Sequence, residues 1–447
     1  MPVVADIAGF PGFEVEFRKD GSPAVASDLE GAARFASERD LTDLVVASHG
    51  WNNDMAEARA LYANLFGRVR GLRDGGRSTR LDDRKIGVLA ILWPSKKFAE
   101  RDLIPGGAAA MGGPPSPGQV REIQGHIDAL GGFFDRPGAD QSLDRARLLI
   151  PQLEDSPGAR RRFADLIRST LAVSESDPEG EPGRFVARDG ESLMRQLRAP
   201  ILVGHPPRSE GGKAAAGLRD MMGGVTRTIA DAGRAATDAA GRLLNLATYY
   251  QMKDRAGVIG LDGCHRMLGR VRAESRGIKL HLIGHSFGGR LLTAACLGPE
   301  GRPAIVPQSL TLLQAAFSHD GFGTKIDGTR DGYFRRVVAQ GRVAGPILIS
   351  HTANDYAVGI AYALASRLAG QAGAAIGDAG DRFGGIGRNG AQKTPEAIFT
   401  TLGPVGTPYD FRPGRVYNLR ADRYIGGHGD IARDEVAHAL LSAIAAT

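Results

Sequence analysis

The sequence predicts an α/β protein whose mostly parallel central sheet, flanked by helices, is interrupted by a large, mainly helical insertion. Short apolar runs alternate with helical patterns in both outer parts of the chain, as in parallel sheets built from right-handed crossovers. Residues 95–255 break this alternation over a length too great for one crossover. A strand, tight turn and helix are expected within 277–297, where a serine stands between glycines. We therefore assign 1–94 and 256–447 to the core and 95–255 to the insertion.

The first part of the core contains four expected strands and two expected helices. Apolar runs bounded by turn residues define the strands, and apolar residues at helical spacing define the helices. The expected strands are 3–10, 13–17, 44–48 and 86–93, and the expected helices are 29–39 and 55–72. Pro11-Gly12 is expected to separate the first two strands. Asn53 or Asp54 is expected to be the N-cap of the second helix.

The insertion begins with a Gly/Pro/Ala-rich loop and continues with helices near 120–134, 142–153, 159–171, 191–197 and 217–251. Between Val225 and Tyr250, apolar residues recur in steps of four and three, with small residues in the middle of the seam. One interpretation is a mobile or lipid-contacting lid helix. The other is a helix packed over the core, favoured because acidic and basic residues share its polar side.

The second part of the core resumes the alternation of strands and helices. The pattern predicts strands at 279–284, 309–313, 346–350 and 416–420. Helices are expected at 256–275, 357–368 and 431–445, with a Gly/Ala/Asp-rich excursion over 370–390.

The overall composition is that of an ordinary globular protein. The net charge of +6 over 447 residues is modest and does not argue for a nucleic-acid partner. Two cysteines, Cys264 and Cys296, are too few for a disulfide framework and are expected to be buried free thiols. No secretory signal is seen at the N-terminus and no run of 18 apolar residues occurs, so the expected location is cytoplasmic.

The turn at Gly284-His285-Ser286-Phe287-Gly288 matches G-x-S-x-G, the nucleophile elbow. A serine on a sharp strand-to-helix turn has strained backbone, so close neighbours must lack a Cβ atom. The turn exposes the hydroxyl near the positive end of the following helix. The alternative is a Gly-rich loop that connects strand and helix or cradles a phosphate. The predicted strand before it and helix after it favour the elbow.

Serine becomes a good nucleophile when a histidine takes its proton and a carboxylate orients that histidine. Asp355 follows the strand expected at 346–350, and His428 follows the last expected strand within Gly426-Gly427-His428-Gly429-Asp430. Both therefore belong at the carboxyl ends of parallel strands, beside the elbow. The chain order is Ser286, Asp355, His428.

In this order and with this elbow, residues 1–94 and 256–447 resemble the α/β-hydrolase superfamily. The resemblance implies an α/β-hydrolase fold with the insertion as a cap. It also implies that the His49-Gly50-Trp51 turn and the residue after the serine form an oxyanion hole from the N–H groups of Trp51 and Phe287. His49, Gly50, Asn52 and His285 would lie on the substrate side. The segments HGWNN and GHSFGG look like those of uncharacterised bacterial hydrolases of this superfamily.

Each candidate has a structural alternative. Asp355 could serve only as an N-cap of the following helix, and Asp320 is the rival acid, although it follows an earlier strand. His49 could simply pack beneath its turn. The rivals of His428 are as follows: His319, His351 and His438.

The sequence therefore predicts a serine hydrolase that needs no metal or organic cofactor. A carboxylic ester, including a lipid ester, is the favoured substrate because a helical cap is suited to shielding an apolar acyl pocket. An amidase or peptidase of the same fold is the alternative within enzymes. A non-catalytic protein that binds a ligand or partner under the cap is the alternative outside them. The expected partners are a small-molecule or lipid substrate, no nucleic acid, and at most peripheral lipid contact through the insertion; the oligomeric state is left open.

Overall fold

The computed structural model describes residues 5–51, 53–76, 81–95, 117–171, 188–198, 235–355, 357–358 and 384–447. They divide into two compact units. One holds the described residues of Met1–Ser95, Lys253–Tyr362 and Gly377–Thr447, and the other holds those of Lys96–Met252. The borders expected from the sequence, at 94/95 and 255/256, lie one and three residues from these.

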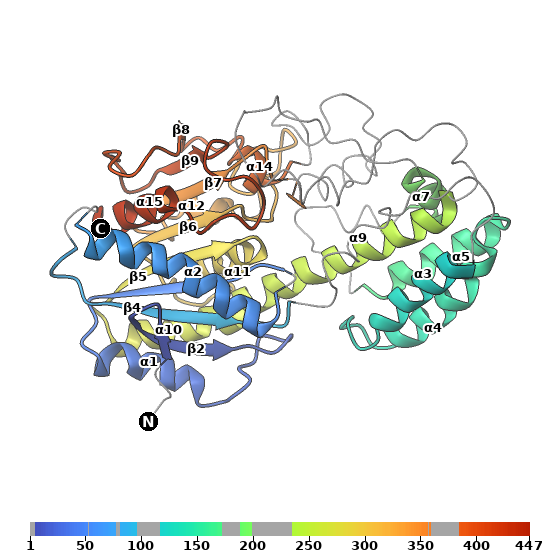
Figure 1. Ribbon diagram of the computed structural model, residues 1–447, viewed down its shortest axis with the longest axis horizontal. Helices are drawn as coiled ribbons and strands as arrows, with labels where there is room; N and C mark the ends of the chain where they lie inside the picture. The colour runs from blue at the N-terminus through green and yellow to red at the C-terminus, as the bar shows by residue number, and fades with distance from the viewer. Residues whose placement is uncertain are drawn as a thin grey trace. The chain divides into compact units, whose positions relative to one another are not determined.

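The first unit is built on a mostly parallel sheet, which for the described residues has nine strands in the order β1-β2-β4-β3-β5-β6-β7-β9-β8 (Figure 1). Only β1 is antiparallel to its neighbour. The strands are β1 Ala5–Ile7, β2 Phe10–Glu16, β3 Asp43–Ser48, β4 Ile86–Leu92, β5 Lys279–His285, β6 Ser309–Leu313, β7 Ile347–His351, β8 Ala397–Thr401 and β9 Val416–Arg420. The predicted α/β class and mostly parallel sheet are confirmed.

The first two strands meet at a different turn from the predicted one. The break lies at Ala8 and Gly9, both with positive φ, whereas Pro11 and Gly12 are inside β2. Gly12 is needed within the strand because a Cβ there would lie 2.7 Å from the side chain of Ile7. The prediction of a break at Pro11-Gly12 was wrong because Pro and Gly are also used in edge strands, where packing decides their place.

Helices cover both faces of the sheet. On one face, α2 Met55–Asp74 and α15 Asp434–Ala445 share a hydrophobic core with Val45 and Ala47 of β3. The alternate β3 residues Leu44 and Val46 are fully buried outside that core. Burial of both faces explains why β3 reads as one continuous apolar run.

The remaining helices of this unit include α1 Asp28–Glu38, η4 Ile259–Cys264, α10 His265–Glu274, α11 Phe287–Leu297, α12 Arg335–Ala339 and α14 Ile386–Asn389. The predicted N-cap of α2 is Asp54, whose carboxylate accepts from the backbone of Ala56 and Glu57 in a capping box. The π-helix η4 allows close packing on α11, since a Cβ at Gly260 would lie 2.1 Å from the carbonyl oxygen of Leu291.

The second unit is helical over its described residues, with α3 Pro117–Ala129, α4 Ala139–Leu149, η2 Ile150–Gln152, α5 Pro157–Ser169, α7 Gly190–Leu197 and part of α9 Ala235–Val258. The border between the units falls within α9. The part of the predicted seam that is described is buried: Ala236, Ala239, Leu243, Leu246 and Tyr250. Residues 217–234 of the predicted helix lie outside the described residues.

The sequence did not predict β8, a short edge strand with mostly exposed side chains. It contains no buried apolar run, and only its β-branched and aromatic residues could have indicated a strand. Of the helix expected at 357–368, only 357–358 are described. Cys264 and Cys296 are free and buried, as predicted. No helix among the described residues is long and apolar enough to cross a membrane.

A buried polar row joins the starts of three strands. His281 lies 2.9 Å from Asp43 Oδ1 through its Nε2 and 2.8 Å from Ser309 Oγ through its Nδ1. Thr42 and Arg84 also contact Asp43 Oδ2. Burial lowers the pKa of His281 despite the attraction of Asp43. For Asp43, burial favours the neutral acid, but the hydrogen bonds from His281 and Thr42 outweigh it and lower the pKa of the carboxyl.

We expect His281→Leu to lower the free energy of unfolding by about 1–3 kcal/mol, because Asp43 and Ser309 each lose a buried partner. The unfolded chain takes up a proton at this histidine below about pH 6.5. On acidification the wild type therefore loses the stability that the neutral His281 side chain contributes. Urea unfolding at pH 7 and pH 5 should show the gap between wild type and variant narrowing at the lower pH. A gap of constant size would contradict the proton linkage.

Candidate active site

Ser286 stands in the sharp turn between β5 and α11. Its φ of 56° and ψ of −126° are a strained conformation for a residue with a side chain. Backbone hydrogen bonds hold it there: its N–H donates to Leu313 O, and its carbonyl accepts from Gly289 and Ala316. The serine is also the residue before the first turn of α11, so its hydroxyl lies at the positive end of that helix.

The two glycines of the motif permit close backbone approach around this turn. A Cβ at Gly284 would lie 2.5 Å from the backbone of Gly288 and Gly289. A Cβ at Gly288 would lie 2.2 Å from the carbonyl oxygen of Ser48, at the end of β3. The glycine pattern is therefore explained by packing of the elbow against itself and against β3.

The structure brings Ser286, His428 and Asp355 into one hydrogen-bonded row. Ser286 Oγ lies 2.9 Å from His428 Nε2, and His428 Nδ1 lies 2.9 Å from Asp355 Oδ2. The Asp355 side chain is fully buried, whereas that of His428 is 25% exposed. The other oxygen of Asp355 accepts from the backbone N–H of Val358 at 3.0 Å. One oxygen of Asp355 thus accepts from the backbone, as in the N-cap alternative. The other oxygen faces His428 and can orient its ring.

The charges around His428 favour a histidine that can take up a proton. Burial opposes its protonation, but the attraction of Asp355 outweighs it and raises the pKa of His428. Burial, together with repulsion by His428, lowers the pKa of neighbouring His285 to about 3. Burial lowers the pKa of His49 to about 4. Of these three histidines, only His428 therefore has a pKa that its surroundings raise, as suits a group that accepts a proton.

The rival residues are engaged elsewhere. Asp320 Oδ2 accepts from Lys393 Nζ at 2.8 Å. The rival histidines lie against other groups: His351 against Arg388 O, His319 against Asn389, and His438 against Thr407 O.

The turn at 49–51 lies directly against the serine, since a Cβ at Gly50 would be 2.4 Å from Ser286 Cβ and 3.0 Å from its Oγ. The rings of Trp51 and Phe287 are in contact, with centroids 6.2 Å apart. Of the expected substrate-side residues, Gly50 therefore lies directly beside the hydroxyl. Asn52 lies outside the described residues.

His49, also expected on the substrate side, is fully buried beneath this turn. Its Nε2 accepts from Trp93 N at 3.2 Å and its Nδ1 lies 2.9 Å from Gly50 O, while the ring stacks on that of Trp93. These contacts favour the alternative in which His49 packs beneath its turn. Asn53, which the sequence offered as a candidate N-cap, instead donates from its side chain to Gly50 O and Trp51 O. Ser95, which the sequence analysis did not select, donates to Asn53 O and so also supports the turn.

The buried polar row at the other end of the sheet also consists of an aspartate, a histidine and a serine. Residue types alone therefore do not identify an active site. Asp43, His281 and Ser309 have similar distances but are at most 2% exposed and lie in ordinary strands. Ser286 differs in its strained turn and in its contact with a partly exposed histidine. Position at the carboxyl ends of the strands, rather than composition, therefore distinguishes the candidate site.

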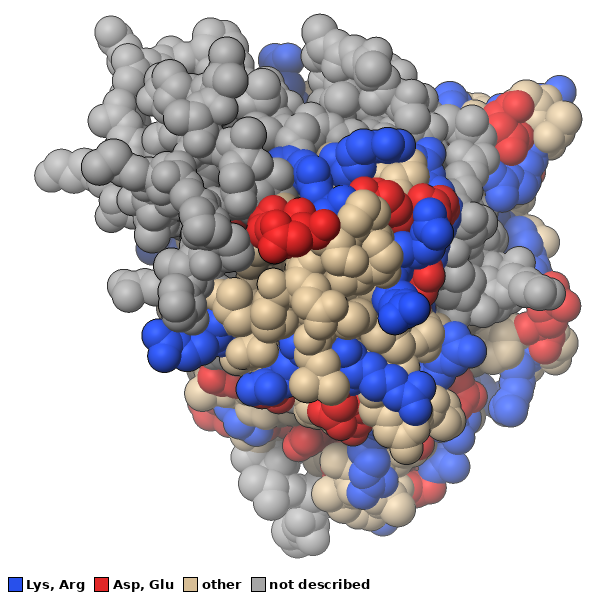
Figure 2. Space-filling view, turned by 90° about the vertical axis from the view of Figure 1, so that its right-hand side faces the viewer, with Lys and Arg blue, Asp and Glu red and all other residues tan. Residues whose placement is uncertain are grey.

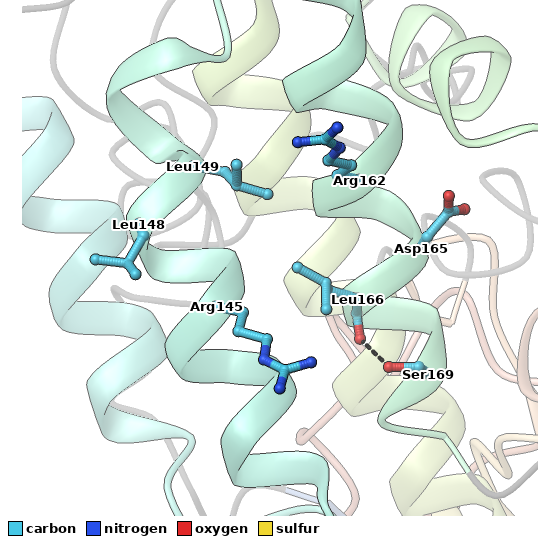
Figure 3. Close-up of a pocket in the computed structure, with 7 residues that line it drawn as sticks. All are labelled: Arg145, Leu148, Leu149, Arg162, Asp165, Leu166 and Ser169. Atoms are coloured by element: carbon cyan, nitrogen blue, oxygen red, sulfur yellow. Dashed lines mark hydrogen bonds between the residues drawn. The ribbon is translucent and has the colours of Figure 1, made fainter.

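The helical unit has a separate surface hollow of about 530 Å³ between α4 and α5. Figure 2 shows an uncharged area on the face that it views, with Lys and Arg side chains and some Asp and Glu side chains around it. Figure 3 shows Leu149 and Leu166 pointing into the hollow, while Asp165 points away. Among the described lining residues the only serine is Ser169, whose hydroxyl is hydrogen-bonded to Leu166 O and Ser142 Oγ. No histidine is among those lining residues. The hollow therefore lacks the groups that activate a serine.

The loops that carry Asp355 and His428 are tied together by residues that the sequence analysis missed. Asn354 Nδ2 donates to Asp422 O at 3.0 Å and to Ile425 O at 2.9 Å. Asp422 Oδ1 accepts from Thr352 Oγ1 at 3.0 Å. Their positions, next to the acid and shortly before the histidine, are the only sequence signal that could have indicated this role.

Within the described residues, no group of three or more His, Cys, Asp or Glu side chains is placed to hold a metal ion. Comparison of the chain with protein-family models, with curated proteins and with solved structures finds no match. The class that fold and site define is thus an α/β protein with a Ser–His–Asp row at the carboxyl edge of its sheet.

Gly50→Ala should cut the rate of any reaction at Ser286 by roughly 100-fold, because its methyl group overlaps Ser286 and displaces the hydroxyl. Gly67→Ala, in α2, is the matched control, since a Cβ there meets nothing within 4 Å of the described structure. Turnover of an ester and melting curves for both variants provide the measurement. Wild-type turnover by Gly50→Ala would show that the turn does not lie against the nucleophile as described.

Asp355→Asn should reduce kcat by about 10⁴-fold, as loss of the orienting carboxylate does in other triads. Because Asp355 raises the pKa of His428, the acid limb of kcat/KM against pH should also move to lower pH in this variant. Asp320→Asn is the control and should leave that limb unchanged. The opposite pattern, with loss only in Asp320→Asn, would assign the acid to Asp320.

Proposed function

We propose that the protein is a serine hydrolase of the α/β-hydrolase type that cleaves a carboxylic ester through an acyl-enzyme. The observation that carries the proposal is the single row from Ser286 Oγ through both nitrogens of His428 to Asp355, with 2.9 Å at each step. The strained backbone of the serine supports it, because such strain persists where function requires it. A protein that only binds a ligand needs none of this arrangement.

In the proposed reaction, Ser286 Oγ attacks the ester carbonyl carbon while His428 Nε2 takes the hydroxyl proton. Asp355 keeps the other nitrogen protonated and stabilises the imidazolium that forms. The carbonyl oxygen becomes an oxyanion, for which the N–H groups of Trp51 and Phe287 are the proposed donors. The leaving alcohol takes the proton from His428, and a water molecule then releases the acid by the same steps in reverse.

The proposed substrate class rests on the large helical insertion in the chain, which suits an apolar acyl group better than a charged one. A lipid ester belongs to this class. An amide would use the same row, with an amine as leaving group. The chemical difference lies in the leaving group, so substrate panels decide between them.

Fluorophosphonate labelling tests the proposal most directly. Wild-type protein should label at Ser286, and Ser286→Ala should abolish labelling with a nearly unchanged melting temperature. Ser309→Ala is a matched control, because that serine belongs to the buried row at the opposite end of the sheet. It should label as the wild type does.

Esters of graded acyl length, with the corresponding amides, then define the substrate class. Faster cleavage of the esters would support the proposed class, and faster cleavage of amides would replace it with an amidase. A wild-type protein that neither labels nor cleaves would favour a binding protein of the same fold.

A further inference from the structure

The backbone around His428 is unusually free of side chains that could hold it. Gly427 and Gly429 flank it, and a Cβ at either position would meet nothing within 4 Å among the described residues. Glycine backbone loses more conformational freedom on ordering than any other residue. Yet His428 keeps both ring nitrogens 2.9 Å from their partners. Something other than steric confinement must fix this part of the loop.

The known anchors of the loop hold its two ends. Asn354 binds the carbonyls of Asp422 and Ile425 before the glycines. Asp430 accepts from Gly426 N at 3.0 Å and pairs with Arg433 after them. Two backbone hydrogen bonds hold the flanking glycines, from Asp430 N to Gly427 O and from Ile431 N to Gly429 O. None of these anchors contacts the carbonyl oxygen of His428.

His285, the residue before the nucleophile, makes that contact. Its Nε2 lies 2.9 Å from the carbonyl oxygen of His428, and the two rings lie 4.9 Å apart. A carbonyl oxygen only accepts, so the Nε2 atom of His285 carries the proton and donates. Since burial keeps the ring neutral, its Nδ1 has no proton.

Among the described residues, no atom forms a hydrogen bond with that buried Nδ1 atom. The imidazole leaves a buried acceptor unsatisfied, which an aliphatic side chain of similar size would avoid. Packing alone therefore does not account for a histidine at this position. The hydrogen bond from Nε2 does, because no aliphatic side chain can donate it.

We propose that His285 is a positioning residue: its Nε2–H fixes the peptide of His428 and thereby the imidazole between Ser286 and Asp355. The inference rests on the proposed function of that row. It assigns His285 a different role from substrate binding, which the sequence favoured. His285 and Ser286 are neighbours in the chain. The end of β5 therefore positions both the elbow and the loop that carries His428.

The test compares two amides at position 285. In His285→Gln the side-chain amide reaches the place of Nε2, whereas in His285→Asn it reaches only the place of Nδ1. His285→Asn should lose roughly 10- to 100-fold in kcat with KM little changed, as expected for a misplaced catalytic group. His285→Gln should recover most of that loss. His265→Gln is the matched control, since this buried histidine contacts the carbonyl of Ala295 through its Nδ1, which glutamine does not replace, and lies away from the row; its kcat should stay at the wild-type value.

A measurement that does not need turnover separates this inference from the proposed function. The Nδ1–H of His428, bonded to Asp355, should give a low-field proton resonance in wild type and in His285→Gln that weakens or disappears in His285→Asn. If the wild type shows this resonance but cleaves no ester, the proposed function fails while the positioning role is still tested. His285→Leu replaces His285→Asn in the same comparison if the latter does not fold.

Three outcomes would overturn the inference. One is an unchanged resonance and kcat in both His285→Asn and His285→Leu. Another is a raised KM at constant kcat, which would return His285 to substrate binding. The third is an equal loss in His285→Gln and His285→Asn, which would show that the donor at Nε2 does not matter.

Discussion

The strained turn at Ser286 is the constraint on which the rest of the site depends. A residue with φ of 56° at the end of β5 is kept in place only if the surrounding backbone binds it from several sides. The last residue of β6, Leu313, and Ala316 in the loop after it supply two of those hydrogen bonds, and the first turn of α11 supplies another. Close packing of Gly288 on the end of β3 then brings the 49–51 turn against the hydroxyl. The elbow thus sets the spacing of its neighbours as well as its own shape.

Around this turn, the protein separates the properties of three nearby histidines by their environments. Burial depresses the pKa of His49 and of His285, although the carbonyl oxygen that each ring contacts acts in the opposite direction. His428 alone faces a buried carboxylate, and the pKa of its imidazole is raised. A proton released near Ser286 therefore has one favourable acceptor. The neutral histidines support backbone, one beneath the 49–51 turn and one behind the His428 loop.

The Ser–His–Asp row at the opposite end of the sheet gives a useful contrast. Hydrogen bonds between its three residues join the starts of β3, β5 and β6. These residues are buried and lie in regular strands, so their hydrogen bonds serve to hold the three strands together. The same residue types thus join strands at one end of the sheet and, in the proposed function, transfer a proton at the other.

The sequence by itself determined the α/β class and most strand positions, and it made Ser286, Asp355 and His428 the favoured candidates. These inferences depend on local pattern: apolar runs, the glycine spacing of the elbow, and polar residues after strands. It misplaced the break between β1 and β2 and missed β8, since packing against Ile7 and pairing at the sheet edge are not local. Only the tertiary structure brought Asp355 and His428 to Ser286 and separated them from Asp320 and the other histidines. It also disclosed Asn354, Asp422 and His285 as supports. Such residues act through contacts between distant segments, and those contacts exist only after parallel strands place their carboxyl ends side by side.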